Sequence, residues 1–159
     1  MSFESDIKAF AAKANLNMDS AVRTVVMALA TQINERSPVG DKLLWSSKFV
    51  AAAGKLGWIE PGAKGYIGGH FRANNQYKFG SLPTGEIDGI DKDGAKTMAI
   101  LQSDLFASPV AGMHYIANNV PYAVRLENGY SSQAPAGIYG LAMMSVAGAI
   151  DSVIKGAVK

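Results

Sequence analysis

An apolar stripe between Met18 and Glu35 constrains the fold of this chain more than any other feature. Its members recur at spacings of three and four residues, which places them on one face of a helix: Val22, Val25, Val26, Leu29 and Ile33. Ser37-Pro38 follows, and a proline disfavours helical backbone in the residue before it. The pattern predicts a helix from Met18 or Asp19 to Glu35 whose stripe packs in the core.

Three further segments have helical character. Residues 2–14 carry apolar side chains three and four apart, at Phe3, Ile7, Phe10, Ala11 and Ala14. Asp91 or Asp93 can cap another helix, because an aspartate accepts hydrogen bonds from the first N–H groups of a helix. The apolar run 136–157 follows Pro135, a residue that favours a helix start, and predicts the last helix.

Two segments predict strands. Phe71 to Phe79 alternates apolar and polar residues, and Val110 to Asn118 is a short apolar run in which Gly112 can form a bulge. Together the segments predict an α+β fold, with long N-terminal helices and a C-terminal helix packed on a small, mainly antiparallel β-sheet. A chain of 159 residues can bury one core, so we expect a single domain over 1–159.

Residues 39–69 interrupt this pattern as a long inserted loop. Glycines and Pro61 punctuate the segment, yet its aromatic side chains are too apolar for an ordinary solvated loop: Trp45, Phe49, Trp58 and Tyr66. Lysines between these aromatics could suit a phosphate backbone. We favour a contact with a partner, because aromatic residues are enriched at protein interfaces.

Charge is distributed unevenly along the chain. Between Pro38 and Gly80 there are six basic and two acidic residues, whereas between Glu86 and Glu127 there are six acidic and three basic ones. Such a distribution would allow head-to-tail contacts between identical copies. The net charge of +2 is too small to indicate a nucleic-acid-binding protein by itself.

The chain offers little for catalysis or for a cofactor. It has no cysteine, so disulfides and thiolate metal sites are excluded, and its two histidines are too few for a zinc site. A calcium loop with Gly94 at its glycine position would lack the required acids, since Gly89 and Ile100 would occupy the first and last ligand positions. We expect no metal and no cofactor, in a soluble cytosolic product without a membrane span.

The stretch 121–135, reading PYAVRLENGYSSQAP, predicts a short helical turn, a tight reversal at Asn128-Gly129, a polar loop and the entry to the last helix. Ser131 and Ser132 do not stand in a G-x-S-x-G nucleophile motif. The residues themselves therefore favour a structured turn over an active site.

Five segments in a fixed order carry a resemblance to a known family. They are Arg36 to Val39 (RSPV), Phe71 to Asn74 (FRAN), the acidic-glycine segment Asp91 to Ala95, Asn118 to Ala123 (NNVPYA) and Leu126 to Gly137 (LENGYSSQAPAG). In this order they resemble the neck and tail-completion proteins of long-tailed bacteriophages, including minor tail proteins of the lambda completion type. In that family the SPV segment runs almost directly into the FRAN segment, whereas this chain inserts residues 39–69 between them. The chain also departs from the family at Asn75, where an aromatic residue often follows the asparagine.

The resemblance implies a structural virion protein with no enzymatic activity. It implies a ring, usually sixfold, that completes the tail end and joins it to the head connector, with DNA passing non-specifically through its lumen. The expected partners are other copies of the chain and neighbouring neck, connector and tail-tube or terminator proteins, with no membrane. The protein would lie at the head–tail junction of the virion, after assembly in the host cytoplasm. A tail terminator and a connector-side adaptor or stopper ring are alternative positions.

We expect the contacts between copies to involve the turn and the inserted loop. The candidate interface residues are Trp45, Phe49, Trp58, Tyr66, Arg72, Tyr122, Arg125, Glu127, Tyr130, Ser132 and Gln133. A more distant alternative is a small hydrolase that uses His114 with Ser131 or an aspartate, which would need a nucleophile, a base and an orienting group close together. A third is a free DNA-binding protein, whose affinity would fall steeply with salt.

Overall fold

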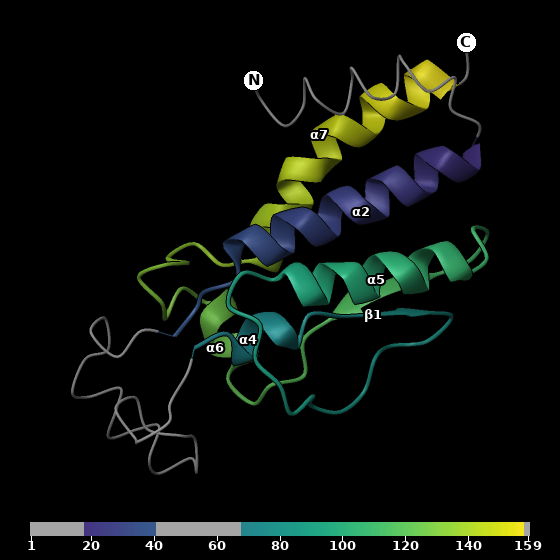
Figure 1. Ribbon diagram of the computed structural model, residues 1–159. Coiled ribbons are helices and arrows are strands. Elements are labelled where there is room, and N and C mark those ends of the chain that lie inside the picture. The colour runs from purple at the N-terminus through teal and green to yellow at the C-terminus, as the bar shows by residue number, and fades with distance from the viewer. Residues whose placement is uncertain (1–17, 41–67, 158–159) are drawn as a thin grey trace.

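The computed structural model describes residues 18–40 and 68–157, and the expected helix over 2–14 lies outside these residues, as does most of the 39–69 insertion. Its fold is α+β: three long helices pack together with one two-stranded antiparallel sheet. In Figure 1, α2 (Met18–Arg36) lies between α7 (Tyr139–Ala157) and α5 (Ala95–Ala107), and the sheet lies beyond α5. Two short helices, α4 (His70–Ala73) and α6 (Ala123–Glu127), lie beside each other at one end of the molecule.

The α2–α7 pair forms the core of the described fold. Near the end of α2, Ile33 packs in one cluster with Ile138 and Ala142, and near its start Ala21 packs in a second cluster with Val146. The two helices are therefore antiparallel. The helix α2 ends at Arg36, one residue beyond the predicted Glu35 and directly before Ser37-Pro38.

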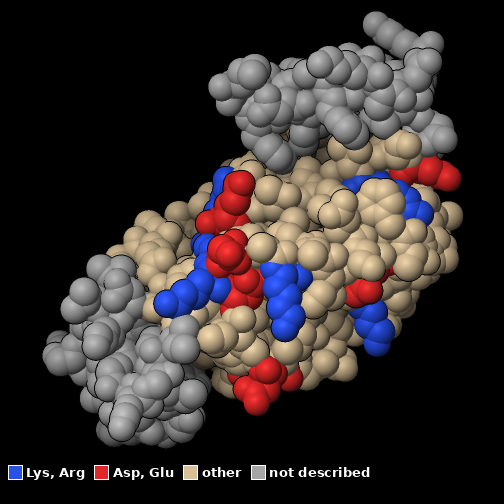
Figure 2. Space-filling view, in the orientation of Figure 1, with Lys and Arg blue, Asp and Glu red and all other residues tan. Residues whose placement is uncertain are grey.

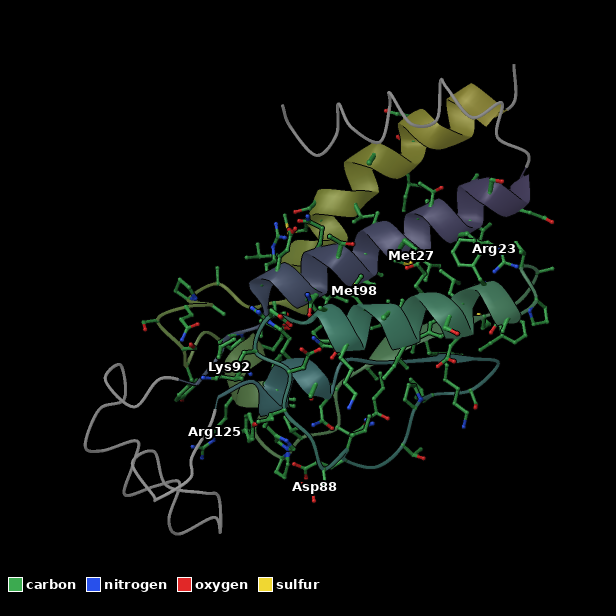
Figure 3. The ribbon with its side chains drawn as sticks, viewed as in Figure 1. Arg23, Met27, Asp88, Lys92, Met98 and Arg125 are labelled. Atoms are coloured by element: carbon green, nitrogen blue, oxygen red, sulfur yellow. The ribbon has the colours of Figure 1, made fainter. Side chains whose placement is uncertain are left out.

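Contacts between α2 and α5 are both polar and apolar. The guanidinium of Arg23 donates to the carbonyl oxygens of Leu105 and Ser108 at the end of α5, where helix carbonyls lack partners. Figure 3 shows Met27 of α2 and Met98 of α5 between the two helices. The far end of α5 is thus tied to the first turns of α2.

The two aspartates bind N–H groups at the start of α5, although the residue at the N-cap position itself is Gly94. Asp91 accepts hydrogen bonds from the backbone N–H groups of Gly94 (3.1 Å) and Thr97 (2.7 Å), and Asp93 accepts one from Ala95 (3.0 Å). Burial raises the pKa of Asp91, but hydrogen bonds from the side chain and backbone of Thr97 and from neighbouring groups outweigh it and hold the pKa below its ordinary value. Both aspartates therefore stabilise the fold through hydrogen bonds at the start of α5.

The sheet pairs β1 (Gln76–Phe79) with β2 (His114–Ala117), with Tyr77 opposite Ile116. The prediction of one strand from Phe71 to Phe79 was wrong in its first half, because His70–Ala73 is helical. Gly69 has φ +109°, and the N–H of Ala73 donates to its carbonyl oxygen (3.0 Å), which closes a helical turn before the strand can begin. The second strand is also shorter than the predicted 110–118.

The last helix begins later than predicted. Gly137 has φ +92°, a left-handed conformation incompatible with a helix, so α7 starts at Tyr139 rather than near Pro135. Its predicted end at Ala157 is confirmed. In the described ranges, 18–40 and 68–157, no helix combines the length and the apolar character needed to cross a membrane.

Candidate assembly surface around α6

The carboxylate of Glu127, the last residue of α6, binds the first turn of α7. One oxygen, Oε2, accepts hydrogen bonds from the backbone N–H groups of Ile138 (2.9 Å) and Tyr139 (2.8 Å), and Oε1 accepts one from Gly140 (2.8 Å). The first N–H groups of a helix have no partner within the helix, and the helix dipole favours a negative charge there. Glu127 therefore joins α6 to the start of α7.

Two glycines permit this close approach. A Cβ on Gly137 would lie 2.6 Å from the backbone oxygen of Glu127, and a Cβ on Gly129, which has φ +80°, would lie 2.3 Å from the backbone oxygen of Pro135. Neither distance is possible for a real Cβ atom. The glycines of the LENGYSSQAPAG segment are thus required by its own geometry.

The electrostatics of this junction follow from its hydrogen bonds. Burial raises the pKa of Glu127, but the three backbone N–H groups stabilise the carboxylate more and leave the pKa below its ordinary value. Burial, together with the charge of Glu127, raises the pKa of Tyr139. The carboxylate is therefore held in its charged form and the phenol in its neutral form.

A polar network centred on Asn75 lies beside the segments that carry the family resemblance. Asn75 donates to the hydroxyl of Ser37 (2.8 Å), and its own side-chain oxygen accepts from Asn118 (2.9 Å) and from the hydroxyl of Tyr139 (2.9 Å). Asn75 and Ser37 are buried. Ser37 of RSPV and Asn118 of NNVPYA thus meet at Asn75, which follows FRAN, together with Tyr139 of α7.

The outer surface of α6 and of the following loop carries exposed apolar groups. The side chain of Val124 is 72% exposed and that of Tyr130 is 66% exposed. The guanidinium of Arg125 lies over the ring of Tyr130, 6.0 Å from its centroid, within the range of a cation–π interaction. Ser132 is exposed in the same loop. We call Val124, Arg125, Tyr130 and Ser132 the α6 surface.

The 41–67 insertion leaves the fold beside this loop. The side-chain amide of Gln133 donates to the carbonyl oxygen of Val39 (2.7 Å) and accepts from its N–H (3.1 Å). A Cβ on Gly68 would lie 2.2 Å from the backbone oxygen of Gly40, so the chain departs and returns at the same place. The insertion therefore adds 27 residues at a single point of attachment.

The structure divides the candidate interface residues into two groups. Arg72 donates to the backbone oxygens of Ser37 (2.7 Å) and Lys92, and Tyr122 packs on the ring of Phe71 with centroids 6.2 Å apart. With Glu127 these residues bind other parts of the fold, whereas Arg125, Tyr130 and Ser132 are exposed; Gln133 is exposed and also binds Val39. The remaining four lie outside the described residues: Trp45, Phe49, Trp58 and Tyr66.

Charged side chains show no segregation on the face drawn in Figure 2, where acidic and basic groups lie next to one another. Figure 3 places Arg125 at the same end of the molecule as Lys92, which comes from the predominantly acidic section of the sequence. Of the basic residues in the predominantly basic section, only Arg72 and Lys78 are in the described part.

Both histidines have partners within the fold. His70 contacts the carboxylate of Glu86 (2.6 Å), and the ring nitrogens of His114 contact the hydroxyl of Tyr77 (2.8 Å) and the carbonyl oxygen of Val110 (2.9 Å). The Ser131 hydroxyl accepts from the N–H of Gln133 (3.2 Å). The two groups bound by the ring nitrogens of His114, the Tyr77 hydroxyl and the Val110 carbonyl, thus include neither a serine nor an aspartate. Within residues 18–40 and 68–157, no group of three His, Asp or Glu side chains could hold a metal ion.

Sequence reasoning missed the role of the asparagines. Asn74 is fully buried, and its side chain accepts from the N–H of Ile87 (2.7 Å) and donates to the carbonyl oxygen of the same residue (3.0 Å), which fixes the loop between β1 and α5. Consecutive asparagines beside apolar residues at 74–75 and 118–119 were the available signal.

Comparisons of the chain with protein-family models, with curated proteins and with solved structures found no match.

Proposed function

We propose that this protein is a structural component of a bacteriophage neck, which forms a ring that completes the tail end and joins it to the head connector around the DNA channel. The observation that carries the proposal is that residues within the five segments bind one another. Arg72 donates to the backbone oxygens of Ser37 and Lys92, Asn118 donates to that of Phe71, and Gln133 donates to that of Val39. Segments that resemble the neck and tail-completion family are far apart in the sequence but support one another in space. This is what a shared fold requires of its recurring residues, and it supports the resemblance as a relationship of fold.

The α6 surface is the part of the described molecule that best fits a contact between copies. Interfaces are enriched in tyrosine and arginine, and the exposed pair of Tyr130 and Arg125 offers both beside the apolar Val124. The residues behind this surface are held by Glu127 and by the two constrained glycines. A rigidly presented patch loses little conformational entropy on binding.

The insertion supplies a second contact in this proposal. Its attachment next to Gln133 places its base beside the α6 surface, and its aromatic residues have the composition of an interface. We propose that the segment between Trp45 and Trp58 is an arm that binds an adjacent ring. A tail terminator or a connector-side adaptor or stopper would use the same two contacts at a different position in the neck.

Cryo-electron microscopy of the phage particle that carries the protein would test the assignment. We expect a ring of copies at the head–tail junction, with α6 at the contact between neighbouring copies. If the protein is absent from the junction, the proposed function is wrong.

A matched pair of variants tests the α6 surface separately. Tyr130 and Phe106 are both exposed aromatics with an arginine over the ring, Arg125 at 6.0 Å and Arg23 at 5.2 Å. Tyr130→Glu should abolish complementation of a phage that lacks the protein, and Phe106→Glu on α5 should not, while both variants keep the circular dichroism of the parent. The opposite result would move the contact from α6 to α5.

A further inference from the structure

The two ring nitrogens of His70, the first residue of α4, both face hydrogen-bond acceptors. Nδ1 lies 2.7 Å from the carbonyl oxygen of Gly89, and Nε2 lies 2.6 Å from Oε1 of Glu86. A backbone carbonyl oxygen can only accept a hydrogen bond, and so can an ionised carboxylate. Because a neutral imidazole carries a single N–H, only the charged imidazolium can donate to both partners at once.

The side-chain amide of Asn74 leaves the Nε2 atom of this ring free to donate to Glu86. Its Nδ2 atom has two hydrogens, which go to the backbone oxygens of His70 (2.9 Å) and Ile87 (3.0 Å). The ring atom Nε2 lies further from this amide, at 3.4 Å. The shorter contact, to the carboxylate of Glu86, therefore determines that Nε2 carries a hydrogen.

The second histidine, His114, has the partners of a neutral ring. Its Nε2 can donate to the carbonyl oxygen of Val110 (2.9 Å), while Nδ1 can accept from the hydroxyl of Tyr77 (2.8 Å). Each ring nitrogen thus has a suitable partner without a second ring proton. Of the two histidines in the chain, His70 is the one whose contacts require a positive charge.

The loop between β1 and α5 is held against α4 by two side chains of that helix and its C-cap. Asn74 binds the N–H (2.7 Å) and the carbonyl oxygen (3.0 Å) of Ile87, through contacts that involve no charge. His70 binds Glu86 and Gly89, which lie on either side of Ile87 in the sequence. The side chain of Ile87 is 45% exposed, so these contacts position an apolar part of the surface.

We propose that His70 is a pH-sensitive latch that holds residues 86–89 against α4. Histidine is the side chain whose charge changes between about pH 5 and 8. The charged ring binds Glu86 and Gly89 together, whereas after loss of the proton one of these acceptors faces a ring lone pair and its hydrogen bond is lost. Because the closed loop favours the charged ring, the latch stabilises the loop at the lower end of this range and releases it as the pH rises.

The charged group that contacts the ring is the carboxylate of Glu86. Two neighbouring charged groups have other partners: Arg72 of α4 donates to the backbone oxygens of Ser37 and Lys92, and the carboxylate of Asp91 binds the start of α5. Glu86 is therefore the counter-ion of the charged ring. The other charged side chains on the loop and on the helices beside α4 are Asp88, Lys92, Asp93, Lys96, Asp104, Arg125 and Glu127.

Amide hydrogen exchange at Ile87 measures the latch, when it is expressed as a protection factor so that the intrinsic pH dependence of exchange cancels. Between about pH 5.5 and about pH 8, we expect the protection factor of Ile87 in the full chain to fall about threefold to fivefold, as suits a partly exposed ion pair. The amide of Gly80 is an internal reference, because it donates to Met113 (2.9 Å) at the other end of the same loop. Its protection factor should stay constant.

Three variants identify the groups responsible. His70→Gln removes the titrating ring while His114 remains, and should abolish the pH difference at Ile87. Glu86→Gln removes the counter-ion and should reduce this difference. Asp88→Asn is the matched control, because it removes an exposed carboxylate from the same loop and should leave the pH difference unchanged.

A measurement on the parent chain keeps the test informative if His70→Gln does not fold. The ring ¹⁵N signals of His70 in nuclear magnetic resonance should change over the same pH range as the protection factor of Ile87. Equal protection at both pH values in the parent would overturn the proposal, as would a pH difference that survives His70→Gln or a ring transition at a different pH. The proposal is independent of the proposed function.

Discussion

The junction between Glu127 and the start of α7 gives the sharpest prediction about stability. Glu127→Ala removes the acceptor of three backbone N–H groups, those of Ile138, Tyr139 and Gly140. Ile138 is fully buried, so water replaces the lost acceptor poorly there, whereas Gly140 is exposed and its N–H can be hydrated. An N-cap is worth about 0.5–2 kcal/mol and a hydrogen bond to a charged group about 1.5–3 kcal/mol. We therefore expect a loss of about 2–4 kcal/mol in the free energy of unfolding.

Chemical denaturation and thermal melting followed by circular dichroism would measure this loss. For a chain of this size, 1 kcal/mol corresponds to about 2–4 °C in Tm, so Tm should fall by about 5–15 °C. Glu127→Gln keeps one oxygen and should lose less than Glu127→Ala. Asp88→Ala removes an exposed carboxylate from the loop before α5 and should change stability by less than about 0.5 kcal/mol.

The pH dependence of the stability of the same variants tests how much of the stabilisation comes from the negative charge of Glu127. The pKa of Glu127 is lowered from the ordinary value of 4.5, so the folded state favours the carboxylate. The stability that the Glu127 carboxylate contributes is fully present above the pKa that Glu127 has in the unfolded chain. It is lost as the pH falls through the lower pKa that Glu127 has in the folded protein. The stability gap between the parent and Glu127→Gln should therefore narrow from pH 7 towards pH 3. A gap that does not change with pH, or a loss below about 0.5 kcal/mol for Glu127→Ala, would refute the capping role.

Three further predictions concern the backbone, the loop before α5 and the insertion. Gly137→Ala should destabilise the protein by about 1–3 kcal/mol more than Gly80→Ala, because both have positive φ but only Gly137 lies against other atoms, a difference that denaturant titration would measure. Asn74→Ala should cost about 1–3 kcal/mol, since it removes the hydrogen bonds of a buried side chain to the N–H and the carbonyl oxygen of Ile87, and should speed proteolysis between β1 and α5. A chain without residues 41–67 should remain folded with stability equal to the parent's or up to about 2 kcal/mol higher, because a shorter loop costs less entropy to close. In complementation, that chain should fail to join heads to tails, and normal virions would refute the arm.

Local sequence was sufficient for α2, for the start of α5 and for the reversal after α6, because their determinants lie within a few residues of one another. The spacing of Val25, Leu29 and Ile33 and the following Ser37-Pro38 specify α2 and its end. The aspartates before α5 act on N–H groups up to six residues away. The reversal after α6 needs the positive φ of Gly129, and the Asn128-Gly129 pair predicts such a turn from the sequence.

Strand boundaries depended on contacts that the local pattern does not contain. The segment from Phe71 alternates like a strand, but Gly69 lies against the backbone of Asp91, and Asn74 bonds to a loop 13 residues away. These contacts close a helical turn where the alternation favours an extended chain. The start of α7 was displaced in the same way by the left-handed Gly137.

The sequence alone determined the fold class, the long helices and the turn around Asn128-Gly129, because propensity, periodicity and capping act over short distances. Only the tertiary structure decided what the individual residues of that turn do. From the sequence, Glu127 could have been a surface contact, but its carboxylate binds the first turn of α7. Asn75 forms hydrogen bonds with Ser37, Asn118 and Tyr139, which lie 38, 43 and 64 residues away in the sequence. Hydrogen bonds across such separations depend on how the helices pack, and packing is a property of the whole chain.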